Sequence, residues 1–207
     1  MSKTENSVAS YAIVGFGKIG KALGRAFAHK GIEVSVATTR KPESFASDAA
    51  AIGPEIIPTT LAEAVKADVI FLAVRFESHR DVAKALPDWQ GKIIVDVTNA
   101  YGVPPEQLEG LPAARFVAEA FPGGKLVKGF NHLGAAILER DPAVHGGRRV
   151  VFLASDDDGA ATEIGALAGK LGFAPVELGA LSEGGMLVQA HGNSWGKLIF
   201  QDLVKFG

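Results

Sequence analysis

The sequence predicts an α/β fold: a doubly wound parallel sheet of the Rossmann type with a C-terminal helical segment. Along the 207 residues, short apolar runs alternate with segments whose apolar residues recur at helical spacing, which is the order of βαβ units. The run at 69–74 is hydrophobic throughout and the run at 93–97 is hydrophobic except for Asp96, as expected for parallel strands covered on both faces. The first run ends in glycines and leads directly into a helical segment.

The predicted strands are the apolar runs at residues 11–14, 32–37, 55–57, 69–74, 93–97, 126–130, 149–154 and 175–178. The predicted helices lie between them, at residues 18–30, 43–51, 60–66, 113–121 and 160–171. The first helix carries the apolar stripe Ile19, Leu23 and Phe27, and the last one follows an acidic turn at 156–158. This regular alternation favours a parallel sheet.

The last segment of the chain differs from the rest. Residues 182–206 show no strand signal, and their apolar residues recur at helical spacing: Leu187, Val188, Trp195, Leu198, Ile199 and Leu203. We expect one or two helices here, packed over the sheet edge or on a second subunit, so a homodimer through this segment is predicted. No Gly-, Ser- or Pro-rich linker divides the chain. Residues 11–207 are therefore expected to form one domain, with helices from about residue 182, after a disordered polar tail at 1–10.

The composition excludes several classes of function. The chain has no cysteine, which removes disulfide frameworks, thiol nucleophiles and cysteine-based metal sites. Its net charge is -2, so no basic field attracts nucleic acid or an anionic membrane. The first ten residues lack the apolar core of a secretory signal, and no apolar stretch reaches the ~18 residues of a membrane span. We expect a cytoplasmic protein without a metal, nucleic-acid or membrane partner.

Residues 15–20 read Gly-Phe-Gly-Lys-Ile-Gly between a predicted strand and a predicted helix, which is the context in which G-x-G-x-x-G binds dinucleotides. Gly15 permits the tight turn, Gly17 lets the backbone approach a pyrophosphate, and Gly20 lets the helix pack on the strand. The helix N-terminus adds N–H donors and partial positive charge. The predicted nucleotide-binding residues of this turn are Gly15, Phe16, Gly17, Lys18, Ile19 and Gly20.

The end of the second predicted strand indicates which dinucleotide is bound. NAD sites carry an acid about 20 residues beyond the first glycine, where it binds the ribose 2′-hydroxyl. Here the strand is followed by Thr38, Thr39, Arg40 and Lys41, with no acid. Two hydroxyls, a guanidinium and an ammonium group suit a 2′-phosphate, because Arg offers a fork of donors to phosphate oxygens. The sequence therefore predicts NADP(H).

Further candidates follow the later strands, because ligands of doubly wound folds lie beyond the carboxyl ends of the strands. Val74 and Phe76 are placed to flank the adenine or the nicotinamide, and Arg75 to bind an anionic ligand. We expect Asp96 to cap the loop that follows it, and Asn99 to hydrogen-bond the nicotinamide carboxamide or the ribose.

Among the histidines, His132 is best placed for a functional role. It follows the strand at 126–130 and precedes a helix start of small residues, where it would stack on an acceptor ring or hydrogen-bond it. His191 is expected to pack on the C-terminal helix, and the expected surface histidines are His29, His79 and His145. No catalytic triad, carboxylate pair or H-E-x-x-H motif is present, so neither hydrolytic nor metal chemistry is predicted.

Six motifs occur in order along the chain, at residues 13–20, 38–40, 96–99, 127–131, 153–157 and 179–182. Together they resemble the NADP oxidoreductases that depend on coenzyme F(420), an 8-hydroxy-5-deazaflavin. The oxidoreductase domain of ferric-reducing membrane proteins is similar in fold.

The resemblance implies NADP(H) held by residues 15–20, Thr39 and Arg40, with an acceptor ring stacked on the nicotinamide near residues 131–135. The candidates for the acceptor site are Asn131, His132 and Arg75, and the cofactor site also takes in Gly134 and Ala135. It further implies direct hydride transfer to a small deazaflavin- or flavin-like acceptor. Such a reaction asks the protein for alignment and exclusion of water rather than for acid–base groups, so no catalytic residue is assigned.

Two other interpretations stay open. The first is an NADPH-dependent reductase of a small carbonyl or imine substrate, although such enzymes generally carry a larger helical substrate domain than residues 182–207 provide. The second is a non-catalytic binding module that senses NADPH.

Overall fold

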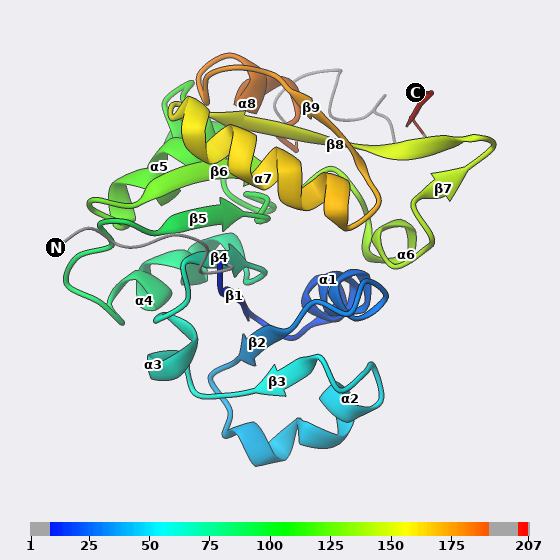
Figure 1. Ribbon diagram of the computed structural model, residues 1–207. Coiled ribbons are helices and arrows are strands. Elements are labelled where there is room, and N and C mark those ends of the chain that lie inside the picture. Colours follow the sequence, from blue (N-terminus) through cyan, green and yellow to red (C-terminus); the bar gives the residue numbers. More distant parts are fainter. Residues whose placement is uncertain (1–8, 191–202, 207) are drawn as a thin grey trace, which may run out of the picture.

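The computed structural model describes residues 9–190 and 203–206, and within them one sheet lies between two layers of helices (Figure 1). The strand order is β10-β8-β6-β5-β4-β1-β2-β3, and β7 and β9 also pair with β8. The strands are β1 (Tyr11–Val14), β2 (Val34–Ala37), β3 (Ile56–Pro58), β4 (Val69–Leu72), β5 (Ile93–Asp96), β6 (Lys125–Gly129), β7 (Ala143–Val144), β8 (Gly147–Ser155), β9 (Ala174–Glu177) and β10 (Val204–Lys205).

The helices are α1 (Lys18–Ala28), α2 (Ala46–Ala50), α3 (Leu61–Ala64), α4 (His79–Ala83), α5 (Ala113–Ala120), α6 (Ala135–Leu138), α7 (Asp158–Lys170) and α8 (Gly184–Leu187). Three 3₁₀ turns complete them: η1 (Pro42–Ser44), η2 (Phe76–Ser78) and η3 (Pro105–Leu108). The longest described helix, α7, has 13 residues, and none of the described helices combines the length and apolarity that a membrane crossing requires.

The sheet from β3 through β2, β1, β4 and β5 to β6 is parallel, which confirms the doubly wound fold. One strand departs from the parallel pattern: β8 runs antiparallel to β6. A parallel return needs a crossover, usually a helix packed across the sheet. Between β6 and β8 the chain forms only the four-residue α6 and a β7–β8 hairpin, with no helix that crosses the sheet. The chain therefore starts β8 at the same end of the sheet at which β6 finished, and β8 runs in the opposite direction.

The C-terminal segment also departs from the prediction. Its described helix is only the four-residue α8, and Val204–Lys205 forms β10, antiparallel to β8, where no strand is predicted. A two-residue strand leaves no periodic pattern, and its pairing with β8 is set by contacts far away in the sequence. Trp195, Leu198, Ile199 and His191 lie outside the described residues, as does the predicted tail up to residue 8. Ser10, within the predicted tail, donates its backbone N–H and its hydroxyl to Asp68 Oδ2 (2.9 and 2.7 Å).

A second unpredicted feature is the pair η2–α4 after β4. Its buried apolar residues, Phe76, Val82 and Ala83, are too few to give a helical period. His79 is buried at 2% exposure and contacts the ring of Phe76 (5.0 Å between centroids), so its expected surface position is wrong. Its Nδ1 lies within hydrogen-bond reach of the Phe76 carbonyl oxygen.

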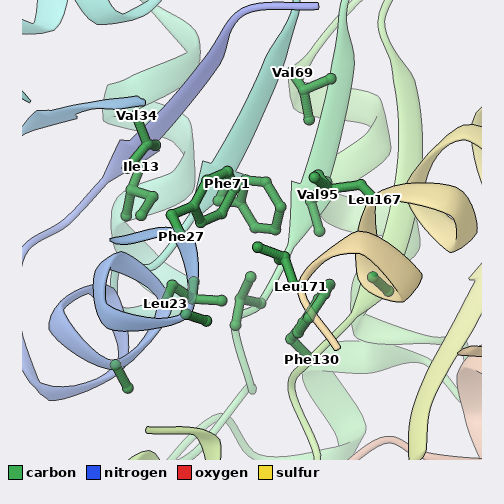
Figure 2. Packing of buried hydrophobic residues seen from close by; sticks show 14 of the residues in the cluster. Ile13, Leu23, Phe27, Val34, Val69, Phe71, Val95, Phe130, Leu167 and Leu171 are labelled. Carbon is green, nitrogen blue, oxygen red and sulfur yellow. The ribbon is translucent and has the colours of Figure 1, made fainter. Parts of the chain in front are cut away.

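One face of the sheet is held by a row of aromatic rings. Tyr11, Phe27, Phe71, Phe130 and Phe173 lie in sequence, with neighbouring centroids 5.5, 5.6, 5.7 and 5.9 Å apart. Figure 2 shows Phe27, Phe71 and Phe130 within the apolar cluster between the sheet and helices α1 and α7. Tilted and edge-on contacts of this kind add to the stabilisation that burial provides. The row ties α1, β4 and the end of β6 together.

The opposite face packs against α3, α4 and α5. Its largest buried side chain is Trp89, whose indole N–H donates to the Ala83 carbonyl (3.1 Å) and whose ring meets Phe121 edge-on at 4.8 Å. The two apolar faces explain why β4 is hydrophobic throughout and β5 is hydrophobic up to its last residue, Asp96.

Candidate nucleotide and acceptor site

Two glycines of the Gly15–Gly20 turn are required by the fold itself. Gly15 has a φ of +103°, and a Cβ on it would lie 2.6 Å from the carbonyl carbon of Ala73, just after β4. A Cβ on Gly20 would lie 2.9 Å from the carbonyl carbon of Gly15. Distances this short are steric overlaps, so a side chain at either position would push α1 away from the sheet.

Gly17 is different, because apart from Gly17 and its two chain neighbours no atom of the described residues lies within 4 Å of the place its Cβ would occupy. Its φ of -80° is open to any residue. It is the N-cap of the 11-residue α1, and no side chain caps the helix there. The first N–H groups of α1 thus face open space with the positive end of the helix dipole. The packing of the fold does not require a glycine at this position. The close approach of a pyrophosphate to the backbone would require one.

The remaining residues of this turn take separate places. Phe16 is buried with its ring 5.8 Å from that of Phe45, so it supports the turn from within. Lys18 is exposed in the first turn of α1, and Ile19 lines a cavity described below.

The loop after β2 presents its polar groups to solvent beside this turn. Thr38 Oγ1 accepts a hydrogen bond from the Arg40 backbone N–H (2.9 Å), which fixes the direction of the loop. The Arg40 guanidinium lies 5.6 Å from the ring centroid of Phe45, while Thr39, Arg40 and Lys41 are exposed. The guanidinium thus packs over the Phe45 ring, while Arg40 as a whole remains exposed.

An ion pair between Lys21 and Asp48 lies near Arg40. Lys21 lies 2.7 Å from Asp48 and 5.7 Å from the ring of Phe16. The hydrogen bond and charge of Lys21, with a smaller contribution from Arg40, lower the pKa of the Asp48 carboxyl. Asp48 has Lys21 as its direct partner, so Arg40 stays available to a phosphate.

The carboxyl ends of β4 and β5 enclose a cavity of about 380 Å³ next to the start of α1. Its lining consists of Ile19, Ala73, Val74, Arg75, Phe76, Glu77, Val97, Thr98, Asn99 and Tyr101. The predicted residues Ile19, Val74, Arg75 and Asn99 are thus brought together. A ligand that lies along the glycine turn would extend directly into this cavity.

Asn131 faces the same region from the end of β6 but does not line the cavity. Asn99 Nδ2 donates to the Asn131 carbonyl (2.8 Å), and Asn131 Nδ2 donates to Asn99 Oδ1 (3.1 Å) and to the Val188 carbonyl (3.0 Å). Both contacts of Nδ2 are to acceptors, so this amide orientation is the consistent one. Asn131 Oδ1, like Thr98 Oγ1, is buried and has no hydrogen-bond partner among the described residues.

The backbone just before Asn131 is strained. Phe130 has a φ of 60°, in the left-handed region that costs a non-glycine residue about 1–2 kcal/mol. Its fully buried ring, packed between Phe71 and Phe173, holds it there. The resulting turn in the chain allows Asn131 to pair with Asn99.

His132 is placed away from the cavity. Its ring lies 5.0 Å from that of Phe152, and Nε2 donates to the Val150 carbonyl (3.3 Å) on β8. Burial lowers the pKa of His132 to about 4, against the smaller opposing effect of that hydrogen bond. The imidazole is therefore neutral at neutral pH. Gly134 is exposed at the N-cap of α6, which packs on α1, and Ala135 is its first residue.

The structure adds three residues to which sequence patterns assign no individual role: Thr98 and Tyr101 in the cavity lining, and the buried Lys128 on β6. Asp96 accepts from the Thr98 backbone N–H (2.9 Å), as its predicted role as a loop cap requires. Among the described residues, no group of three His, Cys, Asp or Glu side chains is arranged to hold a metal ion.

Comparison with known proteins identifies the family. Residues 10–100 match the model of the NADP oxidoreductase, coenzyme F(420)-dependent, family. Metalloreductase STEAP2 of Mus musculus is 31% identical over 174 residues, which are 82% of this chain and 33% of that protein. Residues 10–100 thus belong to the NADP oxidoreductase domain of this family. The chain as a whole spans about one third of the length of the curated relatives that it matches.

Two solved structures resemble this chain over most of its length. A hypothetical protein from Sinorhizobium meliloti is 38% identical with a TM-score of 0.85, over 89% of this chain and 91% of the other. A provisionally named F(420)-dependent NADP-reductase from Arthrobacter sp. FB24 is 25% identical with a TM-score of 0.68, over 84% and 86% of the two chains. These likenesses confirm the Rossmann-type fold, and the nucleotide of the family is NADP(H).

The contrast between the glycines gives a first prediction. Gly17→Val is expected to abolish binding of both NADPH and NADH, because the side chain fills the space in which the pyrophosphate would lie, while stability changes by no more than about 1 kcal/mol. Titration of nucleotide fluorescence and denaturant unfolding measure the two quantities. Gly20→Ala is the matched control and should instead destabilise the fold, since its Cβ overlaps the Gly15 carbonyl. Normal NADPH binding by a folded Gly17→Val protein would show that the turn is not the site.

The lowered pKa of His132 gives a second prediction. The folded chain resists protonation of this ring until about pH 4, whereas the unfolded chain takes up the proton near pH 6.5. The free energy of unfolding should therefore fall as pH drops from 6.5 towards 4. In His132→Gln this fall should be smaller than in wild type by on the order of 1–3 kcal/mol. Urea unfolding at pH 7 and pH 4.5 measures it, with the exposed His29→Gln as control. Equal losses in wild type and His132→Gln would contradict the assignment.

Proposed function

We propose that this protein is an oxidoreductase that transfers hydride between NADP(H) and a deazaflavin- or flavin-like acceptor. The observation that carries the proposal is the open space at Gly17, where the fold does not require a glycine, two residues before Ile19 in the lining of the cavity between the ends of β4 and β5. An elongated dinucleotide fits this arrangement, with its pyrophosphate at the helix N-terminus and its nicotinamide at the strand ends.

The residues along this path suit each part of NADP(H). The backbone of Gly15–Gly20 would hold the pyrophosphate, and Thr38, Thr39, Arg40 and Lys41 the 2′-phosphate. Val74 and Asn99 would contact the nicotinamide half, and the buried Thr98 hydroxyl is a further hydrogen-bond partner for its carboxamide. Gly134 and Ala135, at the start of α6, would border the cofactor from the other side.

The chemistry requires little of the protein beyond alignment. Bound NADPH would supply a hydride from its nicotinamide to the acceptor and would become NADP⁺. The acceptor would gain the two electrons of the hydride and, with one proton from solvent, would become its dihydro form. The apolar side chains Ile19, Val74 and Val97 line the cavity, so they would surround the nicotinamide and limit the access of water to it. No base is needed, in keeping with the neutral His132 and its bond to Val150.

Two side chains support a flat, anionic acceptor. Tyr101 lines the cavity and is 61% exposed, so one face of a planar ring can pack on it. Arg75 is exposed in the same lining and would attract phosphate or carboxylate groups of the acceptor. Flavins and deazaflavins combine a planar ring system with anionic groups.

Arg40→Ala tests the choice of dinucleotide. We expect NADPH affinity to fall by about 10- to 100-fold, since hydrogen bonds to charged groups contribute roughly 1.5–3 kcal/mol, while NADH affinity changes less than about twofold. Arg115→Ala removes an exposed arginine on α5 and serves as the control. Fluorescence titration gives both affinities, and equal losses for NADPH and NADH would mean that Arg40 does not contact the 2′-phosphate.

Stopped-flow absorbance of NADPH oxidation tests the reaction. Deazaflavin, FMN, FAD, a quinone and a cyclic imine are offered in turn to wild type and to Gly17→Val. We expect turnover with the deazaflavin or a flavin in wild type and none in the variant. Turnover with the imine alone would favour a reductase of small substrates. Tight NADPH binding without any turnover would identify a nucleotide-sensing protein and overturn hydride transfer.

A further inference from the structure

A salt bridge is buried at the carboxyl ends of β5 and β6. Asp96 and Lys128 are 0% and 3% exposed, and Lys128 Nζ lies 3.0 Å from Asp96 Oδ2. They are register partners on neighbouring parallel strands. The positions preceding them on the same face of the sheet, Ile94 and Leu126, are apolar. The chain therefore places its charges at one register position of an otherwise hydrophobic surface.

Stability alone does not account for such a pair. Desolvation of two buried charges offsets most of their attraction, and well-packed apolar replacements are often neutral or stabilising. The register neighbour of Lys128 on β8 is Ala154, and apolar residues fill this part of the core elsewhere. A role for the charges is better sought in what they hold.

Both groups bind the backbone of Thr98. Asp96 Oδ1 accepts from the Thr98 N–H (2.9 Å), and Lys128 Nζ donates to the Thr98 carbonyl oxygen as well as to Asp96 Oδ2. The backbone N–H and the backbone carbonyl of Thr98 are thus both held, by the side chains of Asp96 and Lys128, which also pair with each other. Each carboxylate oxygen has its own partner, which restricts the rotation of Asp96.

Thr98 and the next residue form part of the cavity wall. Thr98 Oγ1 has no partner among the described residues, and Asn99 is held by its two hydrogen bonds with Asn131. Lys128 lies one layer behind this wall and is absent from the lining. It contacts no ligand position itself but determines where the Thr98 hydroxyl and the Asn99 amide stand.

We propose that Lys128 is a positioning residue for the nicotinamide half of the cofactor. Paired with Asp96, it clamps the Thr98 backbone so that the cavity wall presents Thr98 and Asn99 in the geometry that hydride transfer needs. This inference rests on the proposed function, because it assigns that half of NADP(H) to the cavity. It predicts that loss of the clamp leaves the adenine half of the site intact.

The double variant Asp96→Asn/Lys128→Met tests the clamp without leaving a buried unpaired charge. The side-chain oxygen of the introduced asparagine would still accept from the Thr98 N–H, whereas nothing would donate to the Thr98 carbonyl. Three quantities are measured: the Kd of 2′,5′-ADP, the Kd of NADPH, and the single-turnover rate of hydride transfer at saturating NADPH. The control is Asp81→Ala/Lys84→Ala, which removes an exposed ion pair on α4.

We expect the Kd of 2′,5′-ADP to stay within about twofold of wild type, and the preference for NADPH over 2′,5′-ADP to fall about tenfold. Hydride transfer should slow by roughly 10- to 100-fold, since a misplacement of about 1 Å at a reacting centre has effects of this size. The control variant should match wild type in all three.

The proposal is overturned if the folded double variant keeps both the wild-type preference for NADPH and the wild-type transfer rate. It is also overturned if 2′,5′-ADP and NADPH binding weaken together, because that indicates a structural role only. The binding ratio does not depend on the acceptor. If wild type transfers no hydride to any acceptor yet the ratio falls in the double variant, the proposed function fails while the positioning role of Lys128 stands.

Discussion

Gly15 lies where the end of β1, the end of β4 and the first turn of α1 meet, and no side-chain atom separates these three backbones. This contact determines where α1 begins relative to the sheet. The same contact brings Ile19 of α1 beside Ala73 and Val74, so that α1, the helix that follows the glycine turn, forms one wall of the cavity. The open space at Gly17 and the cavity are therefore fixed relative to each other by backbone packing. The row of aromatic rings beneath the sheet maintains the arrangement, because Phe27 of α1 meets Phe71 of β4 directly.

Those features that depend on local order could be predicted from the sequence. The strand–glycine–helix unit at residues 11–28 is one example, and the buried strands β4 and β5 are another, because a helical period or a mainly apolar run identifies each. The direction of β8 could not be predicted in this way. Residues 149–154 give the same apolar pattern for either direction, and what decides is the absence of a crossover helix after β6. The two-residue β10 and the short α4 leave no pattern at all.

In the candidate site, too, residues identified by a local pattern could be predicted, and residues that depend on distant contacts could not. Residues that follow a strand or a glycine motif, such as Arg40, Val74 and Asn99, could be placed by rule, since the ends of parallel strands meet at one edge. Lys128 could not. Within the strand Lys-Leu-Val-Lys-Gly it resembles an exposed lysine such as Lys125, which pairs with Asp157 at the surface (3.0 Å). Only the register of β5 against β6 shows that the partner of Lys128 is Asp96, 32 positions earlier.

Gly15, Gly17 and Gly20 have different roles, so substitutions at these three positions should be tolerated differently during evolution. Substitution at Gly15 or Gly20 harms every copy of the chain, whatever that copy binds, because folding itself is impaired. Substitution at Gly17 is silent in the folded state, so only selection for the nucleotide retains the glycine there. A descendant that lost its cofactor would keep the outer glycines and release the middle one. The residue at position 17 can thus separate, among folded relatives, those that still use a dinucleotide from those that retain only the scaffold.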